Sequence, residues 1–386
     1  MDYKSEFRRF LSARPEVLHF AAHSHHYWPD VTFAAHQQAW LDAAERADDK
    51  WGMILDEVLG DLRCHLAEVL DLPDPQTLAF APNTHELLTR LVSCLDGRRL
   101  VTVLTTDAEF HSFARQCARW EEAGLIAVER VPVEPFDTFG PRFLRAARRH
   151  RDLVYVSQVF FNSGFVFEEF SALIDAVPSG ETLIVVDGYH GFFARPTSLR
   201  AVADRVFYLA GGYKYAMAGE GACFMHSPAG YGLRPINTGW FAGPGPDATP
   251  GGTVRYGAGG DRFFGGTFDA SGLYRLRASL KRWRELGVDV PRIHAHVVGL
   301  QQRFLRAVQR AEAGPLQTTD LVPDASHEQR GHFLTFRRSD AGRIQARLRQ
   351  AGVATDVRGD RLRVGFALYH DEIDVDALLQ RLRGLS

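Results

Sequence analysis

The stretches Leu183–His190, LIVVDGYH, and Val206–Tyr215, VFYLAGGYKY, decide the fold of this chain. Each begins as a short apolar run rich in β-branched and aromatic residues, which predicts a buried strand. Asp187 ends the first run, and Lys214 follows the second. Because ligands of open α/β sheets bind beyond the carboxyl ends of the strands, we expect this acid and this amine to meet at one edge of a sheet.

Each of the two residues has an ordinary structural interpretation when it is taken alone. Asp187 could cap a loop, and Lys214 could be an exposed loop lysine. Together they suit pyridoxal 5'-phosphate (PLP) chemistry, in which a lysine holds the cofactor as a Schiff base and an aspartate keeps the pyridine nitrogen protonated. The pair therefore predicts PLP as the cofactor.

Strand-like and helix-like segments alternate from residue 99 to residue 226, a pattern typical of a parallel sheet covered on both faces. The β-rich runs are 100–106, 125–133, 153–160, 183–187, 206–210 and 222–226. A proline- and glycine-rich stretch follows at 234–267. After it, two helices are predicted, at 272–287 and at 293–314. A strand, helix, strand and helix then follow, at 332–338, 341–352, 361–369 and 372–385.

We therefore expect an α/β fold, in which a mostly parallel sheet is sandwiched by helices and a smaller α+β domain forms the C-terminal part. Three parts are predicted: an N-terminal segment 1–50 joining the small domain and the active-site mouth, a large PLP-binding domain 51–275, and a small domain 276–386.

Composition narrows the possible partners and location. The 386 residues carry a net charge of −2, which gives no reason to expect nucleic acid or an anionic membrane as a partner. No run is long enough for a membrane span, and the N-terminus lacks the apolar core of a signal peptide, so a cytoplasmic location is predicted. The four cysteines form no CxxC pair, which argues against a disulfide framework or a zinc site.

Several short motifs, spread in order over nearly the whole chain, resemble those of the class V aminotransferase family and, within it, those of kynureninases. They are Asp187-Gly-Tyr-His190, Gly212-Tyr-Lys-Tyr215 followed by Ala218-Gly-Glu-Gly221, Thr238-Gly-Trp240, and Arg361-Leu-Arg-Val-Gly-Phe-Ala-Leu-Tyr369. The first two together are fairly specific, whereas the others are short. The resemblance implies PLP fold type I for the large domain.

The resemblance also implies roles for the residues around the cofactor. Lys214 would form the internal aldimine and then move a proton between the substrate's Cα and C4′ of the cofactor, while Asp187 would pair with the ring nitrogen. His190 matches a group that contacts the phenolic oxygen, although it could be a hydrogen-bonded loop histidine. Tyr213 matches a phosphate-binding tyrosine, although it could simply pack under the sheet.

The phosphate needs backbone donors at the start of a helix, and Asn83, Thr84 and His85 precede the helical run LLTRLVSCL. These residues could equally form a plain N-cap. Kynureninases carry different residues here.

The family also places an aromatic residue over the pyridine ring. Phe110 matches the kynureninase phenylalanine and is preferred to its neighbour His111, although desulfurase-like relatives use a histidine there. Ser157 and Asn162 match positions that approach the ring in relatives, and Ser157 is the better match.

Other matches concern the neighbouring subunit and the substrate. Trp240 and Thr267 resemble residues that relatives contribute to the neighbouring subunit's phosphate, so the resemblance implies a homodimer with the active site at the subunit interface. Arg363 would bind the α-carboxylate of an amino-acid substrate, and Arg361 competes for this role.

A cluster of histidines near the N-terminus, His23, His25 and His26, could suggest a metal site. Without carboxylate or cysteine partners at defined spacing we predict no metal, and one of these histidines could touch substrate.

The function predicted from these residues is PLP-dependent, kynureninase-like hydrolysis of a Cβ–Cγ bond. An aminotransferase or another PLP lyase acting on a specialised amino acid is the alternative. A cysteine desulfurase is disfavoured, because it needs a nucleophilic cysteine in the C-terminal part and none follows Cys223. A non-catalytic relative would be expected to lose Lys214 or Asp187, and both are present.

Overall fold

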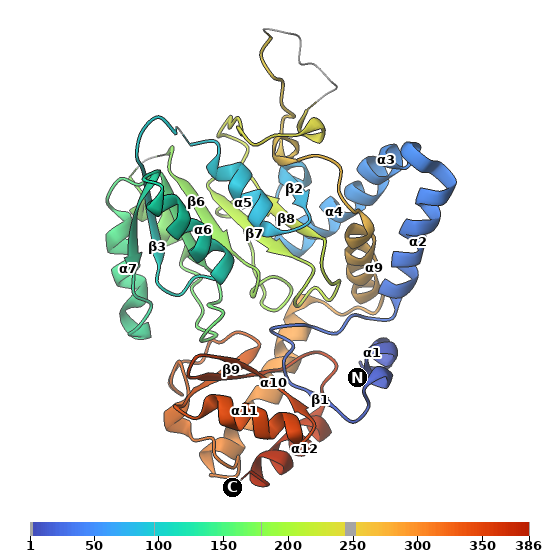
Figure 1. The fold of residues 1–386 in the computed structure, drawn as a ribbon, viewed down its shortest axis with the longest axis vertical. Helices are drawn as coiled ribbons and strands as arrows, with labels where there is room; N and C mark the ends of the chain where they lie inside the picture. Colours follow the sequence, from blue (N-terminus) through green and yellow to red (C-terminus); the bar gives the residue numbers. More distant parts are fainter. Residues whose placement is uncertain (1–2, 96, 179, 244–251, 386) are drawn as a thin grey trace.

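Two hydrophobic cores, each built on one of the two larger sheets, organise the described residues. The computed structural model describes residues 3–95, 97–178, 180–243 and 252–385. A seven-stranded sheet and its helices form the larger part, and a three-stranded sheet with three helices forms the smaller part below it in Figure 1. The predicted α/β fold with a smaller C-terminal domain is confirmed. The domain limits at 50/51 and 275/276 stay predictions.

The large sheet has the strand order β2-β8-β7-β6-β5-β3-β4. Neighbours from β7 to β4 are parallel, so the prediction of a mostly parallel sheet is confirmed. The bounds are β2 Leu78–Ala81, β3 Val101–Thr106, β4 Ile126–Val131, β5 Leu153–Ser157, β6 Leu183–Asp187, β7 Val206–Gly211 and β8 Cys223–His226.

The strand β8 departs from the parallel arrangement and pairs antiparallel with both β7 and β2. Only residues 212–222 connect β7 to β8, and no helix lies in this connection. A parallel crossover needs a dozen or more residues, so this short connection forces β8 to run back along β7. Lys214 lies in the connection.

Burial on both faces explains why the central strands are continuous apolar runs. Leu183, Ile184, Val185 and Val186 of β6 are all buried, as expected for a strand with helices on either side. The register pairs Ser157 with Asp187 and Asp187 with Leu209, so the carboxyl ends of β5 and β6 are level, with β7 alongside.

The helices cover the sheets as the spacing of apolar residues predicts. Helix α5 packs on β2, β7 and β8, and α9 packs against α2 and α4. The bounds are α1 Arg8–Ala13, α2 Val31–Arg46, α3 Lys50–Met53, α4 Leu59–Leu70, α5 Thr84–Val92, α6 His111–Glu122, α7 Phe139–Ala147, α8 Phe170–Ala176, α9 Ser271–Glu285, α10 Val290–Gln309, α11 Ala341–Gln350 and α12 Glu372–Arg383.

The small sheet has the antiparallel order β11-β12-β9, with α10, α11 and α12 around its core. Near the N-terminus a short strand, β1, pairs in parallel with β10 of this part of the chain. The short strands β1, β10 and β11 were not predicted from the sequence. The bounds are β1 Leu18–His19, β9 Phe333–Arg337, β10 Val353–Ala354, β11 Asp356–Arg358 and β12 Arg361–Gly365.

The proline- and glycine-rich stretch at 234–267 contains two short 3₁₀ helices, Trp240–Ala242 and Gly260–Phe263, in the part that the structure describes. Residues 244–251 of this stretch lie outside the described residues. Among the described helices, none has both the length and the apolar character needed to cross a membrane.

Gly188 lies directly after Asp187, and a substitution there can show how tightly the edge of the sheet is packed. A Cβ atom at this position would lie 2.0 Å from Cζ of Tyr208, a fully buried ring whose hydroxyl donates to Oε1 of Gln158 at 2.8 Å. We expect Gly188→Ala to lower the free energy of unfolding by about 1–3 kcal/mol, because the ring must move in a packed core. Denaturant unfolding measures this change.

Gly342 in α11 provides the matched control, because an added Cβ there would meet no atom within 4 Å. Gly342→Ala should leave stability unchanged or raise it by about 0.5–1 kcal/mol. Equal stability of the two variants would contradict the packing described at Tyr208.

Candidate active site

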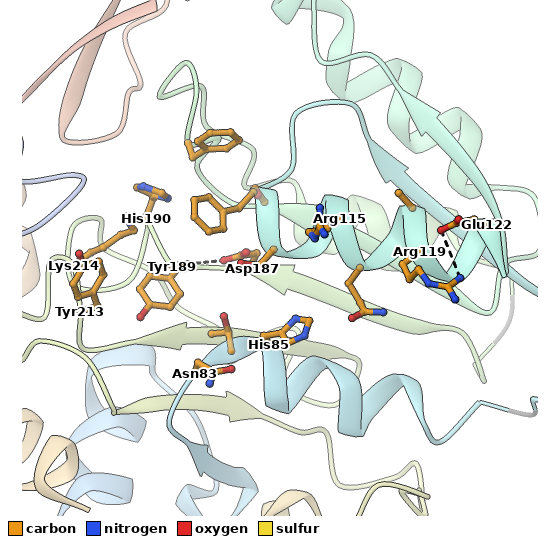
Figure 2. A pocket seen from close by; sticks show the side chains of 17 residues that line it. Asn83, His85, Arg115, Arg119, Glu122, Asp187, Tyr189, His190, Tyr213 and Lys214 are labelled. Atoms are coloured by element: carbon orange, nitrogen blue, oxygen red, sulfur yellow. Dashed lines mark hydrogen bonds and ion pairs between the residues drawn. The ribbon is translucent and has the colours of Figure 1, made fainter. Parts of the chain in front are cut away.

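A cavity of about 1020 Å³ lies at the carboxyl ends of β5 and β6 (Figure 2). Its size is at the upper end of the range for small-molecule and cofactor sites. Nine of the residues predicted from the sequence line it: Asn83, Thr84, His85, Phe110, Ser157, Asp187, His190, Tyr213 and Lys214. Trp240, Thr267 and Arg363 are not among the lining residues.

The Asp187 carboxylate is fixed by two donors. Its Oδ2 accepts a hydrogen bond from the Tyr155 hydroxyl at 2.8 Å, and its Oδ1 accepts one from the backbone N–H of Tyr189 at 2.9 Å. Tyr155 is itself held by stacking on Phe113, with ring centres 3.7 Å apart. Burial raises the pKa of Asp187, and these hydrogen bonds and the charge of Lys214 oppose that effect. A cationic group in the cavity would therefore find an oriented partner.

Lys214 is a buried amine within reach of a backbone carbonyl. Its Nζ donates to the carbonyl oxygen of His23 at 2.7 Å. Burial, followed by the positive charge of Arg363, lowers the pKa of Lys214 to about 7, although Asp356 and Asp187 act in the opposite direction. A large fraction of this amine is therefore neutral at neutral pH, which is the form that attacks a carbonyl.

His190 carries a buried nitrogen that is unpaired within the described part of the chain. Its side chain is buried, and Nε2 has no hydrogen-bond partner among the described residues. Burial and the charges of Lys214 and Arg363 hold the pKa of His190 well below its usual value, so the ring is neutral. Buried polar atoms are rarely left unpaired, so this nitrogen fits a ligand atom placed in the cavity. Together with Lys214 and Asp187, it fits the predicted cofactor.

The start of α5 forms another part of the cavity wall. Asn83 is the N-cap, and its side chain accepts from the N–H of Glu86 at 2.9 Å. Thr84 and His85 are the first two helical residues, and both line the cavity. The N-cap is compatible with the expected phosphate site, because the first amides of a helix have no acceptor within the helix.

The two aromatic alternatives at the start of α6 are placed differently. Phe110 precedes the helix, lines the cavity and is 38% exposed. His111 packs against Phe161 but is not among the lining residues. Of these two aromatic residues, Phe110 is therefore the one that a ligand in the cavity could contact. Phe161 also lines the cavity, whereas the backbone carbonyl of Asn162 accepts from Arg361.

The two arginines of β12 have different surroundings. Arg361 donates to Oε1 of Glu134 at 2.6 Å, near the outside of the molecule. Arg363 is 2% exposed and donates to Asp356 and to the carbonyl of Phe161. Only Arg363 is among the main influences on the pKa of Lys214, so its charge acts on the cavity although its side chain does not line it.

Trp240 and Thr267 lie away from the cavity of their own chain. Both are exposed, and Trp240 has 60% of its surface accessible. Trp240 stacks on Phe241, which in turn packs on Trp51. One chain alone therefore does not bring these two residues to Lys214.

The three N-terminal histidines take separate positions. His23 stacks on Phe333, His25 lies edge-on to Tyr213, and His26 contacts Tyr215 and Tyr369. Within the described ranges, no three His, Cys, Asp or Glu side chains are grouped to hold a metal ion.

Sequence reasoning missed several residues of this site. Tyr155, Tyr189 and Glu109 hold Asp187 and Ser157 in place, and Arg115 and Arg119 of α6 line the outer cavity wall (Figure 2). Tyr155 could have been found, because it lies two residues before Ser157 and shares its face of the strand. Glu109 carried no comparable signal, since a loop carboxylate is normally solvated.

The cysteines do not provide a nucleophile in the cavity. The residues lining the described cavity include no cysteine. Cys223 is buried next to the Tyr189 hydroxyl, and burial raises its pKa to about 12. A thiol with such a pKa stays protonated and unreactive at neutral pH.

Comparison with solved structures identifies the class of fold. A C-DES mutant described as having glycine covalently linked to its PLP cofactor superimposes with a TM-score of 0.82 at 17% identity, covering 97% of this chain and 98% of that one. A cysteine desulfurase from Thermococcus onnurineus gives 0.81 at 17%, over 100% and 98% of the two chains. The cysteine desulfurase CsdA from Escherichia coli gives 0.75 at 17%, over 97% and 96%. The fold is that of fold type I PLP enzymes.

The family comparison is more specific for the C-terminal part. Residues 293–382 match the model of the kynureninase C-terminal domain. No curated protein matches the chain in sequence. The predicted resemblance is thus confirmed, to kynureninases over the C-terminal domain and to the PLP-enzyme fold over the whole chain.

The lowered pKa of Lys214 generates a testable expectation for the ligand-free protein. Since the neutral amine is the reactive form, reductive methylation of Lys214 should rise with pH through a midpoint near 7. Peptide mass spectrometry across the pH range measures it, with the exposed Lys281 as the control for reagent consumption. A midpoint near that of a solvated lysine, about 10, would show that the amine is not desolvated.

Proposed function

We propose that this chain is a PLP-dependent enzyme that acts on an amino acid by kynureninase-like hydrolytic cleavage of a Cβ–Cγ bond. One observation carries the PLP assignment: the desolvated amine of Lys214, the fixed carboxylate of Asp187 and the unpaired nitrogen of His190 share one cavity. The kynureninase assignment is supported by the match over 293–382, which includes Arg363.

Each residue has a chemical task in this proposal. PLP, when bound, supplies the electron sink that stabilises negative charge at the substrate's Cα. Lys214 would hold the cofactor and, as a neutral amine, take and return the proton at Cα. Asp187, oriented by Tyr155, would hold a proton at the pyridine nitrogen. Nε2 of His190 would form a hydrogen bond with the phenolic oxygen of the cofactor.

The substrate's carboxylate would bind Arg363. Asp356 and the carbonyl of Phe161 occupy only some of the guanidinium donors, and the buried Nε has no hydrogen-bond partner in the part of the chain that the structure describes. Since an arginine carries five N–H donors, a planar carboxylate can still bind to it by two hydrogen bonds.

The comparisons also support a second class of reaction. The structural neighbours include a cystine C–S lyase and cysteine desulfurases, so a PLP lyase or an aminotransferase on a specialised amino acid is the alternative. The desulfurase reaction itself is disfavoured, because no cysteine is among the residues lining the described cavity and burial keeps the Cys223 thiol protonated.

We also propose a homodimer with the active site at the subunit interface. Its support is that Trp240 and Thr267 are exposed and do not line the cavity of their own chain, so both are accessible to a second copy. A molecular mass in solution equal to that of one chain, at micromolar protein concentration, would contradict the homodimer. A cytoplasmic location stays a prediction from the sequence.

Cofactor binding is the first test of the proposal. The purified protein incubated with PLP should turn yellow, and borohydride should then fix the cofactor on Lys214, because a Schiff base is reducible. Peptide mass spectrometry identifies the modified lysine, and Lys214→Ala, in which fixation must be lost, is the control. A wild-type protein that stays colourless with PLP would refute the enzyme assignment.

The reaction is tested by offering candidate substrates. Kynurenine and 3-hydroxykynurenine should release alanine, and Arg363→Met should raise KM roughly tenfold to a hundredfold, because a bidentate charge-assisted contact is lost. Arg361→Met is the matched control and should leave KM nearly unchanged. Turnover that instead depends on α-keto acids would favour the aminotransferase.

A further inference from the structure

Glu109 is a buried carboxyl group directly behind the cavity wall. It lies in the loop between β3 and α6 and is 5% exposed. Its Oε1 contacts the Thr106 hydroxyl at 2.8 Å and the backbone N–H of Ser157 at 3.2 Å. Its Oε2 lies 2.5 Å from the hydroxyl of Ser157, which lines the cavity. Ser157 therefore connects Glu109 to the cavity.

The surroundings of Glu109 favour its neutral form. Burial, and to a smaller degree the negative charge of Asp187, raise the pKa of Glu109 to about 8, although the hydrogen bonds from Ser157 and Thr106 oppose this. Asp187 and Tyr155 are the titratable groups that bear on it. A carboxyl group with this pKa carries its proton at neutral pH and loses it in mildly alkaline solution.

The hydrogen-bond pattern decides where that proton lies. Oε1 accepts from two donors, Thr106 and the backbone N–H of Ser157, so the proton of the neutral acid belongs on Oε2. It then points at Oγ of Ser157, and the hydroxyl accepts from Glu109. The hydrogen of Ser157 is left free to be donated into the cavity.

Ionisation of Glu109 reverses this arrangement. The carboxylate can only accept, so the Ser157 hydroxyl must donate to Oε2 and offers only lone pairs to the cavity. The same serine thus presents a donor below the transition and an acceptor above it, without any movement of heavy atoms.

We propose that Glu109 is a positioning residue that sets whether Ser157 offers a hydrogen-bond donor or an acceptor to the ring of a bound cofactor. This inference rests on the proposed PLP site, whose ring carries an electron-rich phenolic oxygen that a donor would bind. In its neutral state Glu109 keeps Ser157 in the donor form.

The affinity of the ligand-free protein for PLP, measured between about pH 6 and pH 10, tests the inference. The wild type should lose about tenfold in affinity through the Glu109 transition, beyond the pH dependence that Lys214 and the ligand impose on every variant. Glu109→Gln should lack this step, because its amide donates permanently to Ser157 while its oxygen accepts from the other two donors. In Glu109→Gln, the absorbance spectrum of the bound cofactor should also lack the change with pH that the Glu109 transition causes in the wild type.

Ser157→Ala separates this mechanism from simple charge repulsion. With no hydroxyl to reorient, this variant should also lack the step, even though Glu109 still titrates in it. A step that persists in Ser157→Ala would mean that the negative charge acts directly, and would overturn the inference. The variant also keeps the test decisive if Glu109→Gln does not fold. Glu129→Gln, on β4, is the control, and its affinity for PLP should depend on pH as that of the wild type does.

The outcomes distinguish this inference from the proposed function. If PLP binds and is fixed on Lys214 but wild type and Glu109→Gln titrate alike, the role of Glu109 is refuted and the PLP assignment stands. If the wild type binds no PLP at any pH, both are refuted.

Discussion

The hydrogen bond from Tyr155 to Asp187 is the contact around which the candidate site is arranged. It joins two adjacent strands at their carboxyl ends and fixes the carboxylate between a side-chain donor and the backbone N–H of Tyr189. The stacking of Tyr155 on Phe113 ties this donor to α6, whose start carries Phe110. Phe110 and Asp187, two of the residues that line the cavity, are thus held by one packed unit.

Desolvation is the second constraint, and it acts differently on each group. It holds Lys214 and His190 toward their neutral forms, and it raises the pKa values of Asp187 and Glu109. The opposite charges of Lys214 and Asp187 partly compensate one another, whereas the charged group among the main influences on Glu109 is the anion Asp187, which raises its pKa further. The two carboxyl groups thus share the effect of burial but differ in their charged neighbours.

The sequence was sufficient for the parts of the fold that depend on local pattern. Continuous apolar runs predicted the central strands, and the placement of Asp187 and Lys214 at one sheet edge followed from parallel topology. The strand β2, the reversed direction of β8 and the short strands β1, β10 and β11 were not predicted, because they depend on pairing between distant segments. Arg363 was preferred from resemblance, and only the three-dimensional arrangement shows that its charge acts on Lys214 while Arg361 is engaged by Glu134.

The antiparallel return of β8 has a consequence for Lys214. The segment 212–222 is anchored at both ends by hydrogen-bonded strands and closed internally by the bonds from Gly212 to Ala222 and from Ala218 to Gly212. A lysine on such a clamped loop has little backbone freedom left to lose when it bonds to a ligand. The entropy of ordering this backbone is thus lost when the protein folds, and it would not have to be lost again each time Lys214 bonds to a ligand.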